Sequence, residues 1–532
     1  MPAALPGIIL LAALGLPVAL FDLGFATGVV SFLSCVALGL GFALWLRRLT
    51  GVSLAPGGRF DAGMAALCFG ISALLCLLGG ELHLFSPTFD WMVRDAVLHD
   101  LVIEPWPVHY EIAGRDFLLR APLGMYLLPA AVGKIFGLIA AHYVLFLQNT
   151  LVLGSLFLVF TATCRTWRAR ALILGVFVIF SGLDVLPCLI EGRLPEWHLE
   201  VWVAALQYSS HLTQLFWVPH HALAGWSFVA AYLLWRRGSL SALSLGAIFT
   251  LCLFWSPLAM MGALPFLIFA LVSDWRGARL HLRDALGPGL ILLGSLPAVF
   301  YLMLDSGAVE KRWLFIDHGY PFRYVAFILI ELGLWLWIFH VRPKEDSEAP
   351  QQGDILIAII LLLLFPLYSI GFSNDFTMRA SIPALAIVAL AAAPRIGAML
   401  QARDARRVVL IAGLVTAAIT PAVEVARAIA KPTIPLGDCT LPSAWKAWEM
   451  QIGIRNVSMA TYLASTDSGS AKAYFAVPAR RVGMDQPCGP PITAFPFRLH
   501  EAPPQRVDLA VGTPAAAKAL KMPPAWGLSA AE

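Results

Sequence analysis

The sequence is poor in charged residues, and this shortage excludes an ordinary soluble protein. Charged side chains make up 13% of the 532 residues and hydrophobic side chains make up 59%, whereas roughly a quarter of a soluble domain is charged. The formal net charge of +4 comes without any dense block of Lys or Arg, so the chain lacks the basic surface by which proteins bind nucleic acid. We therefore expect a lipid bilayer, and no nucleic acid, among its partners.

Several familiar short signals are also absent. The N-terminus has no basic segment, and a second apolar run follows the first after a turn around Asp22, which indicates an uncleaved span rather than a removable signal peptide. No Cys-x-x-Cys, no metal-ligand spacing and no repeat of fixed period occurs, so we assign no metal site and no certain cofactor. The sequence leaves a requirement for a divalent metal open.

The chain does contain many long apolar runs. Runs of roughly 16 to 22 residues recur as far as Arg427, and a run of that length suits a helix that crosses a bilayer. They predict an all-α polytopic membrane protein with about thirteen transmembrane helices in residues 1–427, followed by a tail at 428–532. The expected spans are 5–20, 25–46, 63–80, 143–163, 171–187, 219–235, 241–255, 258–273, 286–304, 323–341, 354–370, 380–394 and 408–427.

The basic residues of the loops predict how these spans are oriented. If the N-terminus is cytoplasmic, about 17 cations fall in short inner loops and about nine in longer outer loops, which is the bias that membrane proteins show. Among the inner loops, 343–353 has a linker-like composition. The expected location is the bacterial inner (plasma) membrane, as an integral protein.

An odd number of spans that starts inside ends outside, so the tail is expected to be periplasmic or extracellular. Its composition suggests a small mixed domain followed by an Ala/Pro-rich end. Cys439 and Cys488 lie in this tail, and we predict a disulfide between them if the compartment is oxidising.

The outer loop at 81–138 concentrates acidic residues on one face of the membrane. Residues 90–101 combine Asp90 and Asp95 with regularly spaced apolar residues, which predicts an amphipathic helix lying on the membrane surface. Loop carboxylates commonly serve only to solvate a loop. The acidic residues of this loop include Asp90, Asp95, Asp100, Glu104, Glu111 and Asp116.

The order of features over residues 60–275 resembles the GT-C glycosyltransferases, such as the lipid A aminoarabinose transferases and the protein O-mannosyltransferases. The chain departs from that pattern in two ways: two extra spans precede the equivalent of the family's first helix, and Ala121-Pro122 replaces paired prolines. The features that carry the resemblance are Asp90, the helix to Leu101, Trp106-Pro107, the run 114–118, the run 122–128, the run 134–137, a span closing on Arg165 and Arg168, and, more weakly, the run 255–257.

This resemblance implies a GT-C-like bundle with amphipathic outer-loop helices, in which 81–138 is the catalytic loop. It also implies transfer of a sugar from a polyprenyl-phosphate donor to a glycan, lipid or protein acceptor at the outer face. The reaction needs a carboxylate to take the acceptor proton and a cation to stabilise the departing phosphate. By position Asp90 is the expected general base.

Outer-face cations are the candidates for binding the donor phosphate. Arg94 lies one helical turn after Asp90, so it is expected on the same face. Arg379 is the strongest of the others, because it stands at the mouth of a span beside Asn374 and Asp375. The remaining candidates are Arg120, His220, His221, Lys311, Arg312 and Arg323, and the candidates for acceptor binding or a second acid are Asp95, Glu111 and Asp116.

Two other function classes remain open. A transporter or flippase of a lipid-linked or polar solute would have internal repeats and charges within its central helices. An O-antigen polymerase or ligase would more often carry its main residues in a large loop late in the chain. The early acidic loop and the lack of a Gly-rich nucleotide domain favour a transferase with a lipid-linked donor.

Overall fold

The computed structural model describes most of the chain. The described residues are 5–49, 61–192, 198–317, 319–341, 350–371, 373–401, 405–454 and 457–466, with 475, 482–483 and 488. Most of the linker-like loop 343–353 and all of the tail after 488 lie outside them.

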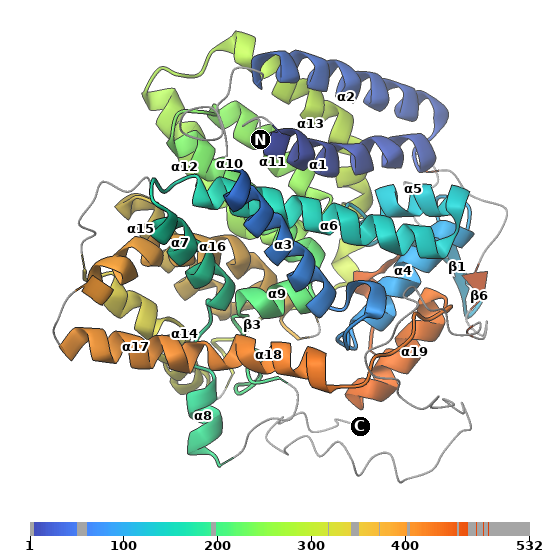
Figure 1. The fold of residues 1–532 in the computed structure, drawn as a ribbon. Coiled ribbons are helices and arrows are strands. Elements are labelled where there is room, and N and C mark those ends of the chain that lie inside the picture. The colour runs from blue at the N-terminus through green and yellow to red at the C-terminus, as the bar shows by residue number, and fades with distance from the viewer. Residues whose placement is uncertain are drawn as a thin grey trace.

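The described chain is mainly helical (Figure 1). Its α-helices are α1 Leu5–Gly24, α2 Gly28–Leu49, α3 Ala62–Leu78, α4 Trp91–Ile103, α5 Leu127–Phe136, α6 Leu138–Thr161, α7 Trp167–Ile179, α8 Val185–Ile190, α9 His211–Trp217, α10 Pro219–Arg236, α11 Ala242–Leu253, α12 Pro257–Arg276, α13 Leu282–Met303, α14 Tyr320–Ile338, α15 Gln352–Leu364, α16 Asp375–Gln401, α17 Ala405–Ala417, α18 Ile419–Ala430 and α19 Leu441–Ile452. Short 3₁₀ turns are η2 Glu81–His83, η3 Ser306–Ala308, η4 Phe365–Leu367 and η5 Met459–Thr461.

Within the described ranges, eight helical segments are long and apolar enough to cross a membrane. This number and composition indicate a helical, polytopic integral membrane protein, as the sequence predicts. Four further apolar helices, α3, α5, α11 and α15 with η4, are shorter than a full span. The eight segments are Leu5–Gly24, Gly28–Leu46, Leu138–Thr161, Pro257–Arg276, Asp284–Met303, Tyr320–Ile338, Asp375–Gln401 and Ala405–Ala430.

The helices differ in how far they are enclosed by their neighbours. In α6 and α16, 78% of the most apolar 18-residue segment is buried inside the protein, whereas in α2 the buried share is 22%. A helix that is apolar all round is expected at the centre of a bundle, with neighbours on every side. Gly262 of α12 lets α16 approach closely, because a Cβ at this position would lie 1.8 Å from the carbonyl oxygen of Ala380. This contact fixes the part of α16 that follows Arg379.

Two small sheets lie outside the helical bundle. The strands β1 His109–Ile112 and β2 Arg115–Leu119 form a hairpin in the outer loop. This hairpin is extended by β5 Leu463–Ser465 and β6 Val482–Gly483 from the tail, in the order β5-β2-β1-β6. The second sheet pairs β3 Lys311–Trp313 with β4 Tyr368–Ile370.

The described part of the tail packs against the outer loop. In addition to the strand pairing, α19 contacts α4 (Figure 1). Cys439 and Cys488, the two cysteines expected to pair, are joined by a disulfide with a Cα–Cα distance of 4.3 Å. The described residues 438–454 and 457–466 therefore contact the outer loop.

Helix α4 corrects the expectation of a helix on the membrane surface. Its polar residues Arg94, Asp95 and Asp100 are buried together with its apolar ones. The amphipathic pattern is the same whether protein or water covers the polar face, and here α19 and α5 supply part of the cover. Helix α4 is therefore an internal element of the fold.

Candidate functional site

Asp90 lies immediately before α4, at its N-cap position, but its side chain makes no capping hydrogen bond. One carboxylate oxygen lies 3.1 Å from the guanidinium of Arg94, and the other accepts a hydrogen bond of 3.2 Å from the indole N–H of Trp448. The Asp90 side chain is 24% exposed. The carboxylate is thus oriented by one donor a single helical turn away and one from a distant segment, and it keeps access to the surroundings.

Arg94 is buried beneath Asp90. The predicted i,i+4 contact is confirmed, but with a side chain only 3% exposed it is no surface ion pair. Arg94 also donates to the main-chain carbonyl of Trp217 in α9. A guanidinium with two fixed acceptors has little rotational freedom, so Arg94 presents a positive charge at a defined position beside Asp90.

Arg379 stands in the first turns of α16 and pairs with Asp375, one turn earlier. Asn374, the residue before α16, accepts a hydrogen bond from the Thr377 main-chain N–H at 3.3 Å. It also donates 2.7 Å hydrogen bonds to the Ala205 carbonyl and to the Thr377 hydroxyl. Asn374 therefore caps α16, and Asp375 is the residue that holds the guanidinium.

The phenol of Tyr462 connects the outer loop with α16. Burial raises the pKa of Tyr462; the charges of Arg94 and Arg379 lower it, and those of Asp90 and Asp375 raise it. All four charged groups are therefore within electrostatic reach of one side chain. We call Asp90, Arg94, Asp375, Arg379 and Tyr462 the polar cluster.

Two adjacent histidines at the start of α10 adjoin this cluster. His220 and His221 are buried, with ring centroids 3.9 Å apart, and both feel the charges of Arg94 and Arg379. The His221 ring is 2.7 Å from the hydroxyl of Ser256. With the N-terminus of α10, this arrangement creates a region of positive potential that suits an anion.

Arg120 has a structural position instead. It is buried and donates hydrogen bonds to the main-chain carbonyls of Ala460 and Leu302. Its guanidinium therefore ties the end of β2 to η5 of the tail and to the end of α13. Phosphate binding by Arg120 stays a prediction.

Lys311 and Arg312 are exposed on β3. Lys311 donates to the Ser306 carbonyl at 3.1 Å, and Arg312 lies 3.7 Å from the Asp317 carboxylate. Among the interactions of the described residues, none joins either cation to the polar cluster. They were predicted from their outer-face position alone, and the β3–β4 pairing directs them elsewhere.

The other acidic candidates lie apart from Asp90. Asp95 forms an ion pair of 2.9 Å with His83, on a separate part of α4. Glu111 and Asp116 face one another across the β1–β2 hairpin, where Glu111 is exposed. We expect an effect on acceptor binding from Asp95 more than from these two, because Asp95 is within electrostatic reach of Tyr126, a neighbour of Arg94.

A second group of ionisable side chains was not predicted. Glu200 and Glu424 are buried beside His198, and Glu331 is buried within electrostatic reach of Glu200. Glu331 and Glu424 belong to candidate membrane spans. Charged residues within apolar runs are a signal of function that the sequence does display. Trp217 connects this group with the polar cluster: its indole N–H donates to Glu424 at 3.1 Å, and its carbonyl accepts from Arg94.

Tyr462 of the polar cluster and Trp448, which contacts Asp90, were also missed. Trp448 and Tyr462 belong to the tail, which the sequence offers as a separate domain. The spacing of Trp445 and Trp448 is visible in the sequence, but nothing local indicates that they meet Asp90.

The arrangement places a partly exposed carboxylate among guanidinium groups, imidazoles and phenols, all of which can bind an anionic ligand. Among the described residues, no group of three or more His, Cys, Asp or Glu is arranged to hold a metal ion. Comparisons of the chain with protein-family models, with curated proteins and with solved structures found no match.

Proposed function

We propose that the chain is a membrane glycosyltransferase of GT-C type that uses a polyprenyl-phosphate-linked sugar. The observation that carries this proposal is the Asp90–Arg94 pair at 3.1 Å, whose charges act on the phenol of Tyr462 together with the charge of Arg379. A carboxylate beside two guanidinium groups supplies the two functions that the reaction requires, a base and an anion site.

The proposed reaction follows from the roles of these groups. The Asp90 carboxylate takes the proton of an acceptor hydroxyl while the hydroxyl oxygen forms a bond to C1 of the sugar. The bond between C1 and the phosphate oxygen breaks, and its electron pair stays on the departing polyprenyl phosphate. Arg94 and Arg379 stabilise the charge that develops there, because hydrogen bonds from guanidinium groups strengthen with the charge of the acceptor.

The proposal includes the orientation expected from the sequence. About thirteen crossings, made by the eight long segments together with α3, α7, α10, α11 and α15, would place α4 and the tail on the extracytoplasmic side of the inner membrane. There the acceptor, whether glycan, lipid or protein, meets the donor. A requirement for a divalent metal ion stays a proposal, to be tested by measuring transfer with the ion added and with the ion removed.

Binding of the leaving group tests the anion site. The full-length chain in lipid nanodiscs should bind a polyprenyl phosphate saturably, and should bind the matching polyprenol at least tenfold more weakly, a difference of about 1.4 kcal/mol. Arg379→Ala should lose most of this preference. Arg312→Ala, which removes an exposed cation of β3, should not. Equal binding of phosphate and alcohol by the unmodified chain would contradict the proposed site.

The alternative function, transport of a lipid-linked or polar solute, is favoured by one observation. Glu331 and Glu424 are buried within candidate spans, and transporters carry ionisable residues at such positions. Proteoliposomes distinguish the two functions: a transporter moves the intact solute across the bilayer, whereas a transferase converts the donor on one side. Translocation of intact donor without its consumption would favour the transporter.

A further inference from the structure

The carboxylate of Asp90 is held from two sides by donors of different origin. Arg94 contacts Oδ2 at 3.1 Å, and the indole Nε1 of Trp448 contacts Oδ1 at 3.2 Å. Arg94 belongs to the same helix as its partner, whereas Trp448 lies 358 positions away in α19. The second donor is therefore present only when the tail is docked on the outer loop.

The two tryptophans of α19 have different surroundings. Trp445 is buried and donates its indole N–H to the carbonyl of Val457 at 3.1 Å, so it fixes α19 to its own segment. Trp448 is only partly buried, packs on Trp445 with ring centroids 4.9 Å apart, and directs its N–H at Asp90. Trp445 also contacts Tyr462, with ring centroids 5.5 Å apart. The aromatic packing sets the direction in which Trp448 points.

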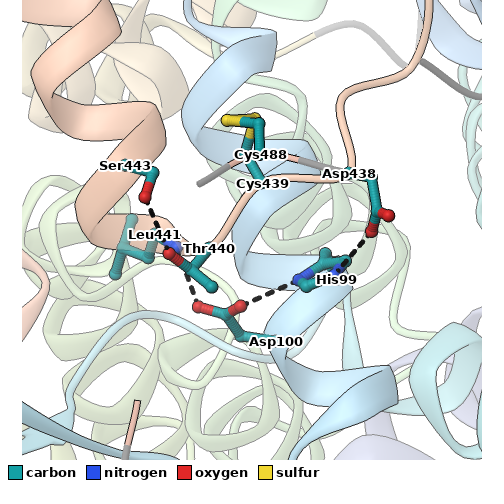
Figure 2. Close-up of a disulfide and its surroundings, with 8 residues drawn as sticks. All are labelled: His99, Asp100, Asp438, Cys439, Thr440, Leu441, Ser443 and Cys488. Atoms are coloured by element: carbon teal, nitrogen blue, oxygen red, sulfur yellow. Dashed lines mark hydrogen bonds and ion pairs between the residues drawn. A yellow bond between two sulfur atoms is a disulfide. The ribbon is translucent and has the colours of Figure 1, made fainter. Parts of the chain in front are cut away.

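The segment that leads into α19 is fastened at three points (Figure 2). His99 of α4 lies 2.9 Å from Asp438, and Asp100 accepts a hydrogen bond of 2.9 Å from the main-chain N–H of Leu441. Cys439, which is joined to Cys488 by the disulfide, lies between these two contacts in the sequence. The first turn of α19 is thus anchored on α4, about three helical turns beyond Asp90.

We propose that Trp448 is a positioning residue for Asp90, so that the tail completes the catalytic site; this inference rests on the function proposed above for Asp90. Each carboxylate oxygen has two lone pairs. With one donor on each oxygen, the carboxylate is fixed in orientation and retains lone pairs for the acceptor hydroxyl. Such fixed geometry is what makes proton transfer efficient.

Trp448→Phe tests the proposal because it keeps an aromatic ring and removes the N–H donor. Trp445→Phe is the matched control, since it removes an N–H that donates to Val457 and not to Asp90.

With polyprenyl-phosphate-linked sugars as donor probes, we expect Trp448→Phe to lower kcat about tenfold with little change in KM. The acidic limb of its pH–rate profile should move to higher pH, because a carboxylate that loses a donor is protonated more readily. Trp445→Phe should leave that limb in place.

A spectroscopic measurement tests the same contact without turnover. In the full-length chain labelled with ¹⁵N-tryptophan, the indole N–H signal that disappears in Trp448→Phe, or in Trp448→Tyr if the Phe variant does not fold, belongs to Trp448. This signal should shift in Asp90→Asn and stay unchanged in Asp95→Asn. An unmoved signal in Asp90→Asn would overturn the inference.

The outcomes separate the inference from the function on which it rests. If Asp90→Asn abolishes transfer while Trp448→Phe keeps the wild-type kcat and pH profile, the positioning role is wrong and the proposed function stands. If Asp90→Asn keeps wild-type transfer, the proposed function is wrong, whatever Trp448→Phe does.

Discussion

His99 Nε2 lies 2.9 Å from the carboxylate of Asp438, which joins α4 of the outer loop to the start of the tail. The other ring nitrogen of His99 lies 2.9 Å from Asp100, so one imidazole is placed between two carboxylates. A neutral imidazole donates only one hydrogen bond, whereas an imidazolium donates two. The docking of the tail therefore depends on the charge of His99.

This relationship predicts that the stability of the docked tail falls as pH rises. Burial lowers the pKa of His99, but the hydrogen bond and charge of Asp100 and the charge of Asp438 act more strongly together and raise it above 6.5. Since the pKa is higher in the folded state, the stabilisation is fully present below about pH 6.5 and is lost as pH rises through the folded-state pKa. His99→Gln should destabilise the protein at pH 6 by about 2 kcal/mol and weaken this pH dependence.

Thermal unfolding in detergent, measured from pH 5 to 9, checks the prediction for His99. His281→Gln is the control, because His281 is exposed before α13. A pH dependence that is the same in His99→Gln and in the unmodified protein would show that another group controls it.

The disulfide provides a second prediction. Cys439 and Cys488 are 49 positions apart, and a cross-link that closes a loop of this length stabilises a fold by up to about 4 kcal/mol. The double variant Cys439→Ser, Cys488→Ser should therefore lower the midpoint of thermal unfolding and increase cleavage by trypsin after Lys446, which is exposed on α19. Cys35→Ser changes an unpaired cysteine and serves as control. Equal trypsin sensitivity in all three proteins would mean that the disulfide does not hold α19 in place.

Glu200 predicts a pH effect from the second group of ionisable residues. Burial raises the pKa of Glu200 from 4.5 to about 7. The folded state therefore binds a proton that the unfolded state has released, and stability falls as pH rises from about 4.5 to about 7. Glu200→Gln should reduce this loss of folding stability by about 1–3 kcal/mol.

The comparison for Glu200 is Glu191→Gln, since Glu191 is exposed after α8. Unfolding midpoints of both variants should be measured across the same pH window. If the unfolding midpoint changes with pH in Glu200→Gln as it does in the unmodified chain, the role assigned to Glu200 is contradicted.

Arg379 carries the prediction for the donor phosphate. Arg379→Lys retains the charge but loses the planar fork of donors, so we expect kcat to fall about tenfold or more, and Arg379→Ala to fall further. KM for a polyprenyl-phosphate-linked sugar should rise less than kcat falls, because the interaction strengthens as the phosphate leaves. Arg312→Lys, at an exposed cation of β3, is the matched control. Wild-type kinetics in both Arg379 variants would remove it from the site.

Sequence reasoning reached the parts of the site that follow from local spacing. Asp90 and Arg94 are four residues apart, and one helical turn brings such residues together without knowledge of the fold. Cys439 and Cys488 are the two cysteines outside apolar runs, so their pairing follows from composition.

The remainder depends on contacts between distant segments. Trp448 and Tyr462 reach the outer loop because β5 pairs with β2 and α19 packs on α4, and strand pairs of two or three residues leave almost no periodic signal. The membrane-surface position expected for α4 was wrong for the same reason. Its amphipathic pattern shows that one face of the helix is polar, but it does not show that protein covers this face. The main-chain acceptors of Arg120, at Ala460 and Leu302, are likewise not visible in side-chain patterns.

The most direct test of the proposed function is release of polyprenyl phosphate from a lipid-linked sugar donor. The purified full-length chain and its Asp90→Asn variant, in nanodiscs with a panel of polyprenyl-phosphate-linked sugars and acceptors, would be followed by mass spectrometry. Asp317→Asn, at a carboxylate beside the exposed Arg312, is the matched control. The account predicts release coupled to glycosylated product by the unmodified chain and by Asp317→Asn, and a loss of at least about a hundredfold in Asp90→Asn, as expected when a general base is removed. Release at the unmodified rate by Asp90→Asn, or no release by the unmodified chain from any donor of the panel, would contradict it.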